Sequence, residues 1–316
     1  MNLFISGGAG FIGSNLVNTI VKDKSIKKIT VYDNFSSGKK WFLKKNKKIV
    51  IVKGDIKNKK KLSLAIKGSN LIYHFAANPD IAAAVKNPDI DFVEGTVLLR
   101  NVLEAMRLNN IKKIIFASGS GVYGDLKNKY LFEDKTVTRP ISTYGASKLY
   151  CESLISSYVN LVGFKGISFR FANVVGDNST HGVCYDFVKK IYQNKNKINI
   201  LGNGKQSKSY LHVTDVVNAL IKVKDIKNYE HRIFNLSTID FISVNKILKL
   251  TLKEFNLKNI KCVYTGGNKG WKGDVPIVRI NDKKFRKLGW SNKLNCKQSI
   301  VETIKFLKKN KDKYKF

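Results

Sequence analysis

The sequence predicts an α/β fold built on a doubly wound, parallel sheet, and three observations point to it. Short β-rich runs alternate with amphipathic helical stretches through the first half of the 316-residue chain. These runs are apolar throughout, as strands buried on both faces of a parallel sheet are. Three glycines at three-residue spacing, Gly7, Gly10 and Gly13, directly follow the first run, where such folds turn from a strand into a helix.

The predicted strands follow one another through the chain. Six runs rich in apolar and β-branched residues have the composition of strands, and a seventh is expected to return to the sheet later. The seven runs span residues 3–6, 27–33, 49–55, 70–76, 112–120, 166–174 and 231–237. Between them, the apolar spacing over 15–23 and 91–110 predicts helices. Crossover helices of this kind join parallel strands.

The regular alternation ends near residue 175, which indicates a second and smaller domain. We expect 1–174, together with about 209–240, to form the larger domain. The ranges 175–208 and 241–316 are expected to form a smaller, interleaved C-terminal domain. The basic tail KFLKKNKDKYKF that ends the chain is expected to be a frayed helix end.

The chain is strongly basic. Its 58 Lys and Arg against 23 Asp and Glu give a net charge of +35, but only seven of the cations are Arg. Surfaces that bind phosphates or base edges favour Arg, because its planar guanidinium group can donate hydrogen bonds to two acceptors at once. Lys is spread over the whole chain, so we interpret the charge as a solvated surface and expect no nucleic-acid partner. A positive field would still favour capture of small anionic ligands.

Cysteine usage and the apolar pattern predict a cytoplasmic protein without a metal site. Cys151, Cys184, Cys262 and Cys296 are far apart, and the sequence has no CxxC and no His cluster at metal-ligand spacing. We therefore expect reduced thiols. No apolar run reaches 18 residues and no cationic leader precedes the first one, so neither a membrane span nor secretion is expected.

The three glycines suit a turn that holds a dinucleotide. Gly7 can take backbone angles closed to other residues, Gly10 lets a diphosphate approach the main chain, and Gly13 lets the helix pack close to the strand. The free N–H groups at the start of the helix then face the phosphates. Phe11 and Ile12, between these glycines, are included in the expected cofactor site.

Residues at the ends of the next strands agree with this interpretation. Asp33, twenty residues after Gly13, can accept hydrogen bonds from the adenosine ribose hydroxyls and would repel a 2′-phosphate, which favours NAD over NADP. The rest of the cofactor would lie at the ends of the second, third and fourth strands. The further expected cofactor-binding residues are Asn34, Asp55, Ile56, Ala76 and Ala77.

A tyrosine and a lysine at a spacing of four begin a predicted helix. Tyr144 and Lys148 therefore lie on one helical face, on successive turns. A free tyrosine is a poor base at neutral pH, and a cation held nearby stabilises its phenolate form. Downstream of a dinucleotide site, this pair predicts a catalytic centre.

With these motifs the chain resembles the extended short-chain dehydrogenase/reductase family, in its nucleotide-sugar epimerase/dehydratase branch. The matching segments occur in family order between about residues 3 and 290. They are GGAGFIG (7–13), VYDN (31–34), GDI (54–56), HFAA (74–77), SGSGVYG (118–124), YGASK (144–148), FRFANVVG (169–176), KSYLHVTDV (208–216) and GWKGDVP (270–276). The resemblance implies a Rossmann domain that holds NAD and a C-terminal domain that holds a nucleoside-diphosphate sugar. It also implies a homodimer built on helices 91–109 and 145–162.

The resemblance also implies roles for single residues. Tyr144 is the expected base, and Lys148 its partner and a ribose ligand, so that both also belong to the cofactor site. Asn173 matches the diphosphate contact of the family. Lys208 falls where many relatives place an Arg against the phosphate, and Lys269 or Lys272 would supply a second phosphate contact.

Two positions depart from the family pattern. Gly119 stands where the family carries the Ser or Thr that completes the catalytic set, and Ser118 and Ser120 flank it. A small backbone shift would let either hydroxyl act, with a modest preference for Ser118, or the chain lacks this hydroxyl altogether. Phe92 replaces an Asn that relatives often carry, which affects a water or proton path.

The residues after Gly119 indicate the reaction. The 4,6-dehydratases of the family carry an Asp-Glu pair there, and this chain has Ser120-Gly121. Without that acid/base pair, the sequence predicts an NAD-dependent 4-epimerase that works through a 4-keto intermediate, with a UDP-hexose, UDP-glucose or UDP-galactose, as substrate. A dehydratase, decarboxylase or dehydrogenase on the same fold is the alternative. A nucleic-acid-binding protein on a dehydrogenase fold is a further one.

Overall fold

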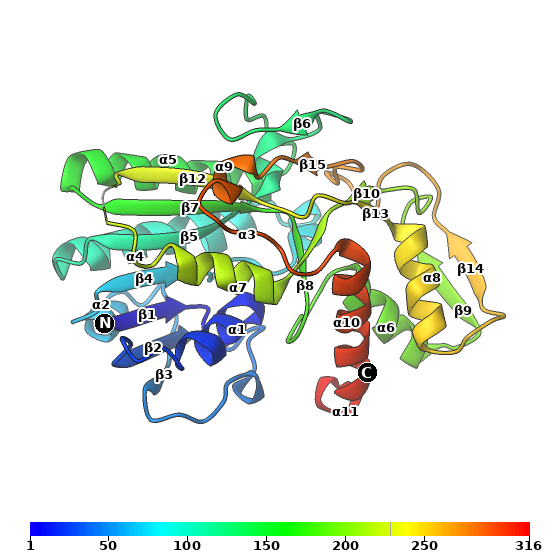
Figure 1. Ribbon diagram of the computed structural model, residues 1–316, viewed down its shortest axis with the longest axis horizontal. Helices are drawn as coiled ribbons and strands as arrows, with labels where there is room; N and C mark the ends of the chain where they lie inside the picture. The colour runs from blue at the N-terminus through cyan, green and yellow to red at the C-terminus, as the bar shows by residue number, and fades with distance from the viewer. Residues whose placement is uncertain (228) are drawn as a thin grey trace.

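The computed structural model describes residues 1–227 and 229–316, and a seven-stranded sheet forms the centre of its larger lobe (Figure 1). The strand order is β12-β7-β5-β4-β1-β2-β3, and every neighbouring pair is parallel. The strands are β1 (Asn2–Ser6), β2 (Lys28–Asp33), β3 (Ile49–Lys53), β4 (Leu71–His74), β5 (Lys113–Gly119), β7 (Lys165–Phe171) and β12 (His231–Leu236). All seven predicted strands are thus confirmed, including the late return of 231–237 to the sheet.

Helices cover both faces of this sheet. On one face, α1 (Phe11–Ile20) and α7 (Val213–Lys222) enclose a core that includes Leu3 and Ile5 of β1. On the other, α2 (Lys59–Ile66), α4 (Leu98–Leu108) and α5 (Thr143–Val162) enclose a second core that includes Phe4. Successive side chains of a strand point to opposite faces, so one apolar strand serves both cores. The doubly wound architecture is therefore confirmed.

The helix expected over 91–110 is interrupted. It consists of α3 (Asp89–Asp91), the π-helical segment η3 (Phe92–Val97) and α4. Gly95 lies in this segment, where an added Cβ would sit 3.0 Å from the Ser147 hydroxyl of α5. The glycine therefore permits close packing of η3 on the helix that carries Tyr144 and Lys148.

A third core lies beyond residue 175 and forms a smaller lobe (Figure 1). It is built from α6 (Val183–Gln193), α8 (Val244–Glu254), α10 (Cys296–Lys309) and the parallel pair β9 (Lys197–Ile200) and β14 (Lys261–Tyr264). Strand β12 belongs to the central sheet, although it lies between α6 and α8 in the chain. The expected domain boundaries stay a prediction.

Short elements complete the fold around the carboxyl ends of the central strands. Three two-stranded pairs join β6 (Tyr130–Leu131) to β15 (Arg279–Ile280), β8 (Asn173–Val175) to β11 (Tyr210–His212), and β10 (Ser207–Lys208) to β13 (Ile242–Ser243). The remaining helical turns are η1 (Lys40–Phe42), η2 (Ile81–Val85), η4 (Ser120–Tyr123), α9 (Lys283–Arg286) and α11 (Lys311–Tyr314).

The expectation of a frayed C-terminal tail is wrong. The rings of Tyr314 and Phe316 stack at a centroid distance of 5.2 Å and an interplanar angle of 4°. Both rings also contact Tyr185 of α6, and Phe316 stacks on Tyr192. Two aromatic side chains therefore hold the basic tail against the smaller lobe.

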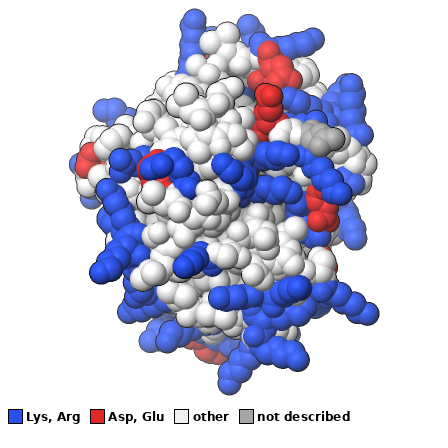
Figure 2. Space-filling view, turned by 90° about the vertical axis from the view of Figure 1, so that its left-hand side faces the viewer, with Lys and Arg blue, Asp and Glu red and all other residues white. Residues whose placement is uncertain are grey.

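The surface charge is dispersed. Figure 2 shows Lys and Arg side chains scattered over the face it presents, with no single stripe. Within 1–227 and 229–316, no helix is long and apolar enough to cross a membrane. The same residues contain no cluster of His, Cys, Asp and Glu fit to hold a metal ion, and the four cysteines are free.

Candidate active site

A cleft of about 1310 Å³ lies between the carboxyl ends of the central strands and the smaller lobe. Its first wall is the turn from β1 into α1. Gly7 has φ +68°, and a Cβ on Gly13 would overlap the carbonyl oxygen of Gly7. Only glycine fits at both positions, because one needs the left-handed region and the other has no space.

The N-terminal end of α1 is suited to bind an anion. Gly10 is the N-cap, and no side chain caps this end of the helix. Its first N–H groups therefore point to the cleft without an internal acceptor, which suits a diphosphate. Gly7, Gly10, Phe11, Ile12 and Gly13 all line the cleft, as the expected cofactor site requires.

Asp33 ends β2 at the next position along the cleft. Its carboxylate accepts hydrogen bonds from the backbone N–H groups of Ala9 (2.9 Å) and Phe35 (2.8 Å). Burial raises the pKa of this carboxyl above its ordinary value, and the two hydrogen bonds oppose that shift. The side chain is thus held still where a ribose would lie. The other expected residues at the strand ends, Asn34, Asp55, Ile56, Ala76 and Ala77, line the same cleft.

Tyr144 and Lys148 meet on the first turns of α5. The N-cap Ser142 starts the helix by accepting a hydrogen bond from Gly145 N (3.1 Å). The ammonium of Lys148 lies 5.4 Å from the centroid of the Tyr144 ring and donates to the carbonyl oxygen of Ala117 (2.8 Å). Lys148 is buried, so its position beside the phenol is well defined.

Positions 118, 119 and 120, at the end of β5, differ in whether a hydroxyl there is free to act in the cleft. Ser118 and Ser120 both line it, but the Ser118 hydroxyl donates to Glu152 Oε1 (2.5 Å). An added Cβ on Gly119 would lie 3.8 Å from Cε1 of Tyr144, at ordinary contact distance. The structure therefore disfavours the preference for Ser118, because its hydroxyl is already used within the protein. It shows that position 119 itself faces Tyr144, the expected base.

A buried network lies beneath this loop. Glu152 pairs with Arg170 (Nη2 to Oε2, 2.7 Å), and both side chains are almost fully buried. Arg170 also donates to the Tyr123 hydroxyl (3.0 Å), which donates to Asn235 (2.8 Å). These bonds join α5, η4, β7 and β12 behind the catalytic positions.

Asp91 positions the start of α5, and the sequence analysis missed it. Its carboxylate accepts hydrogen bonds from Thr143 Oγ1 (2.7 Å) and from Asn78 Nδ2 (2.9 Å), and it is buried. Thr143 directly precedes Tyr144. The neighbouring Phe92 does not line the cleft and is 55% exposed, so its side chain lies outside any path through the site.

The substrate side of the cleft carries two of the four expected residues. Asn173 and Lys208 line it, and Lys208 forms a 2.6 Å ion pair with Asp274. Lys269 and Lys272 do not line it and are exposed, contrary to the expectation of a second phosphate contact.

A tight turn explains that difference. Asp274 accepts a hydrogen bond from Gly270 N (3.0 Å), and its own N–H donates to the carbonyl of Trp271 (3.1 Å). The turn directs Gly270, Trp271 and Gly273 to the cleft and the flanking lysines to solvent. The GWKGD motif indicated where the turn lies, but it did not predict which of its side chains point into the cleft.

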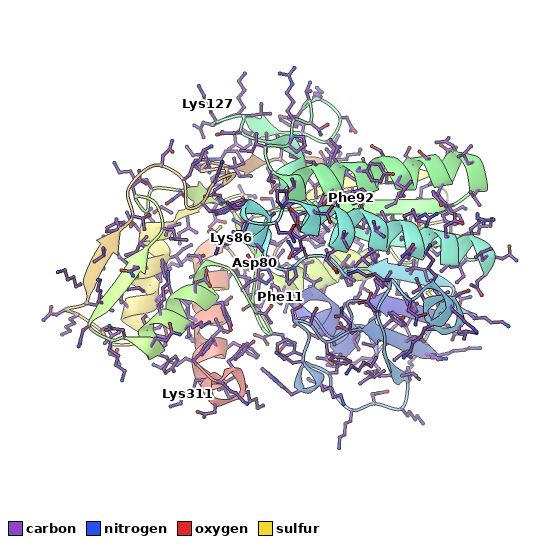
Figure 3. All side chains as sticks on the ribbon, turned by 180° about the vertical axis from the view of Figure 1, so that it is seen from behind. Phe11, Asp80, Lys86, Phe92, Lys127 and Lys311 are labelled. Carbon is purple, nitrogen blue, oxygen red and sulfur yellow. The ribbon has the colours of Figure 1, made fainter. Side chains whose placement is uncertain are left out.

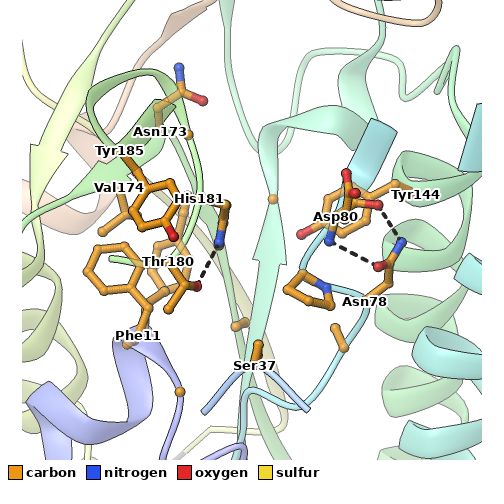
Figure 4. A pocket seen from close by; sticks show the side chains of 18 of the residues that line it. Phe11, Ser37, Asn78, Asp80, Tyr144, Asn173, Val174, Thr180, His181 and Tyr185 are labelled. Atoms are coloured by element: carbon orange, nitrogen blue, oxygen red, sulfur yellow. Dashed lines mark hydrogen bonds between the residues drawn. The ribbon is translucent and has the colours of Figure 1, made fainter. Parts of the chain in front are cut away.

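Residues from both lobes face each other across the cleft. In Figure 4, Phe11, Thr180, His181 and Tyr185 stand on one side, and Asn78, Asp80 and Tyr144 on the other. The Phe11 and His181 rings meet edge to face at 6.5 Å. Figure 3 shows Phe11 and Asp80 near the middle of the molecule, between the lobes. Thr180, His181 and Gly182, which precede α6, line the cleft together with Val183 and Tyr185 at the start of that helix.

The cleft does not share the excess positive charge of the chain. Six lysines and six carboxylates line it. They are Lys39, Lys148, Lys190, Lys208, Lys313 and Lys315, with Asp33, Asp55, Asp80, Glu94, Asp186 and Asp274. The net charge of +35 is therefore carried outside the cleft.

Comparisons with known proteins agree with this geometry. The model of the NAD dependent epimerase/dehydratase family matches residues 3–237. A putative UDP-glucose 4-epimerase of Methanocaldococcus jannaschii is 30% identical, over 98% of this chain and 99% of that protein. A crystal structure of a UDP-galactose 4-epimerase is 31% identical with a TM-score of 0.86, over 98% and 99% of the two chains. A UDP-glucose 4-epimerase from Thermotoga maritima, solved with UDP-glucose, is 26% identical with a TM-score of 0.88 over the same shares.

Proposed function

Because the chain belongs to the NAD dependent epimerase/dehydratase family, we propose that it is an NAD-dependent nucleotide-sugar 4-epimerase, with UDP-glucose and UDP-galactose as substrates. The observation that carries the proposal is the Tyr144–Lys148 pair in the same cleft as the uncapped start of α1. The oxidation of a carbinol by NAD uses a general base beside a dinucleotide site, and this cleft has the expected residues for both. Similar proteins named as UDP-glucose and UDP-galactose 4-epimerases support the choice of sugar.

The residues present account for the proton transfers. The chemistry that NAD would supply, when bound in this cleft, is reversible hydride transfer at C4 of the sugar. Tyr144 takes the proton of the C4 hydroxyl as the hydride leaves, and gives it back to the oxygen of the 4-keto sugar. Lys148 stabilises the phenolate that Tyr144 carries before it takes the proton and again after it returns it, since its ammonium lies 5.4 Å from the ring. The sugar exposes its other face in between, so that the configuration at C4 inverts.

The cofactor fits the cleft on three grounds. Gly13 lets α1 pack closely against the glycine turn, α1 has no side-chain cap, and Asp33 is fixed at the end of β2. Asp33 and Lys148 would hold the two riboses, and α1 the diphosphate. Asn173 and Lys208 would hold the nucleotide of the substrate.

Epimerisation is favoured over dehydration by the residues at 120 and 121. Elimination of water needs an acid/base pair beside the sugar, and Ser120 and Gly121 stand where the dehydratases of the family carry one. A dehydratase, decarboxylase or dehydrogenase remains the alternative, and its product would differ.

We further propose a cytoplasmic homodimer. The four free thiols favour a reducing compartment. Phe92 of η3 and Tyr150 of α5, whose segments pack together, are 55% and 51% exposed. Large exposed apolar side chains on adjacent helices favour a partner surface. Light scattering should give the mass of a dimer, and Tyr150→Glu a monomer, whereas Tyr264→Glu, on an exposed tyrosine of the smaller lobe, should leave the dimer intact.

The function is tested by product NMR. Purified protein, with no added NAD, is incubated separately with UDP-galactose and UDP-glucose. Both reactions should converge on one mixture of the two sugars, and Tyr144→Phe should slow them about 10²- to 10⁴-fold. A dehydrated, decarboxylated or oxidised product, or full activity in Tyr144→Phe, would refute the 4-epimerase.

A further inference from the structure

Trp41 and Tyr314 meet across the mouth of the cleft. Trp41 belongs to η1 in the larger lobe, and Tyr314 to α11 at the end of the chain. Their rings lie at a centroid distance of 5.3 Å, edge to face at 88°. Both side chains line the cleft that also contains Gly10 and Asp33. Two distant parts of the chain therefore close one opening.

Trp41 is held beside the adenosine end of the expected cofactor. An added Cβ on Gly38 would lie 3.0 Å from Asp33 Oδ1, so the segment that leads to Trp41 runs against that carboxylate. Lys39 N donates to the carbonyl of Ala9 in the glycine turn (3.1 Å). Phe42 is buried, and its carbonyl accepts a hydrogen bond from Asn18 of α1 (2.7 Å). The larger lobe thus fixes this side of the opening.

Tyr314 is held by the smaller lobe instead. Its ring stacks on Phe316 and contacts Tyr185 of α6 (5.9 Å). Among the described residues, its buried hydroxyl has no hydrogen-bond partner. The hydroxyl therefore does not tie α11 to the larger lobe.

The contacts between the two sides are individually weak. Besides the ring contacts, Lys313 Nζ lies 5.4 Å from the centroid of a Trp41 ring. No hydrogen bond or ion pair joins 34–44 to 311–316, two segments that the structure describes in full. Aromatic and cation–π contacts of this kind can break and re-form through thermal motion. They still favour the conformation in which the two segments touch.

We propose that Trp41 and Tyr314 form a clasp over the adenosine end of the cleft and set the rate at which NAD leaves. The inference rests on the proposed function, because it takes NAD to be the occupant of the cleft. A 4-epimerase regenerates its NAD in every turnover, so slow release keeps the enzyme loaded. The clasp lies beside Asp33, at the expected adenosine end of the cofactor, whereas Tyr144 is expected at the nicotinamide end, so the chemical step should not depend on the clasp.

The test is the exchange of bound NAD. Holoprotein is mixed with an excess of isotopically labelled NAD, and the label on the protein is followed by mass spectrometry after rapid desalting. Trp41→Ala and Tyr314→Ala should each raise the exchange rate about five- to tenfold. The double variant should be no faster than the faster single one, because both changes remove the same contact. Trp41→Phe should stay near the wild-type rate.

Matched controls separate the clasp from general loosening. Tyr192→Leu removes another ring that stacks on Phe316, but Tyr192 does not line the cleft, so exchange should keep the wild-type rate. Thermal unfolding of each apo variant checks that it folds. If Tyr314→Ala does not fold, the NAD exchange rate of Trp41→Ala is compared with that of Trp41→Phe, and a faster rate in Trp41→Ala supports the clasp.

Two results would overturn the clasp. One is wild-type exchange in the Trp41→Ala variant. The other is a double variant whose acceleration is the product of the two single ones, which would mean that each ring contacts NAD independently. Neither affects the convergence of UDP-galactose and UDP-glucose in the wild type. Wild-type protein that holds no NAD and converts neither sugar would overturn the proposed function, and the clasp with it.

Discussion

The hydroxyl of Ser118 donates a 2.5 Å hydrogen bond to Oε1 of Glu152. Glu152 follows Tyr144 by two helical turns on α5, and it pairs with Arg170 in the interior. This bond therefore sets the end of β5 against the helix that carries the expected base. It separates the roles of the two serines around Gly119, because the Ser120 hydroxyl has no hydrogen-bond partner among the described residues.

We predict opposite effects for the two serines. Ser118→Ala should lower the free energy of unfolding by about 1–3 kcal/mol, because it removes a hydrogen bond from a buried carboxylate. Ser120→Ala should leave stability unchanged and lower kcat about 10- to 100-fold, if this hydroxyl assists the proton transfer. Urea unfolding and product NMR measure the two quantities. A loss of kcat confined to Ser118→Ala would reverse the assignment.

A serine at position 119 should increase activity. An added Cβ there would lie 3.8 Å from Tyr144 Cε1, so Gly119→Ser fits without strain and places a hydroxyl beside the base. We expect kcat to rise about tenfold, within the range of general acid–base assistance. Gly119→Ala is the matched control, since it adds the same Cβ without the hydroxyl, and it should not exceed the wild type. Equal kcat values for the two variants would show that no hydroxyl is missing.

Lys208 should govern substrate affinity rather than turnover. Its ammonium is shared with Asp274 at 2.6 Å and makes a point contact instead of the two parallel bonds of an arginine. Lys208→Ala should raise KM about tenfold with kcat nearly unchanged, and Lys208→Arg should lower KM below the wild type. Lys269→Ala and Lys272→Ala are controls outside the cleft and should keep the wild-type KM. A raised KM in either control would restore those lysines as phosphate ligands.

Acid should weaken the fold through His74. Burial, with a smaller contribution from the nearby Lys148 cation, lowers the pKa of this imidazole to about 3. The unfolded chain therefore binds the proton first, and stability is lost as the pH falls from about 6.5 toward 3. At pH 5 the loss from this one group should be about 2 kcal/mol.

The measurement is urea unfolding between pH 7 and 5, in the wild type and in His74→Asn. Asparagine keeps a polar atom near Ser6 Oγ, which lies 2.6 Å from His74 Nδ1, but it does not titrate. The difference in unfolding free energy between the two proteins should shrink as the pH falls. Parallel profiles would mean that His74 titrates normally in the folded protein.

The expected cofactor site was predictable because its signals are local. Asp33 ends β2, and Gly7, Asp55 and Ala76 follow the ends of β1, β3 and β4 by one or two residues. Parallel strands bring their carboxyl ends to one edge of the sheet. The Tyr144–Lys148 pair was equally visible, since four residues in a helix fix two neighbouring side chains. Such positions need only the correct secondary structure to be placed.

Other positions needed the packed fold. The alternating side-chain directions of β5 could not predict whether the Ser118 hydroxyl points into the cleft or toward Glu152. Its direction depends on where α5 places Glu152 and where β7 places Arg170. The turn closed by Asp274 decided which residues of GWKGD meet the cleft. The aromatic character of Tyr314 and Phe316 was plain in the sequence, but their burial depended on Tyr185 and Tyr192 of a distant helix.

The amino-acid sequence by itself determined the doubly wound sheet, the glycine turn and the helical pair of base and cation, because short-range periodicity and strand-end chemistry specify them. Tertiary structure alone decided that Trp41 meets Tyr314, that Ser118 is used within the protein, and that Lys208 is shared with Asp274. Each of these contacts joins residues far apart in the chain. Their meeting depends on how the lobes pack and which buried polar groups require partners, and no local pattern encodes either.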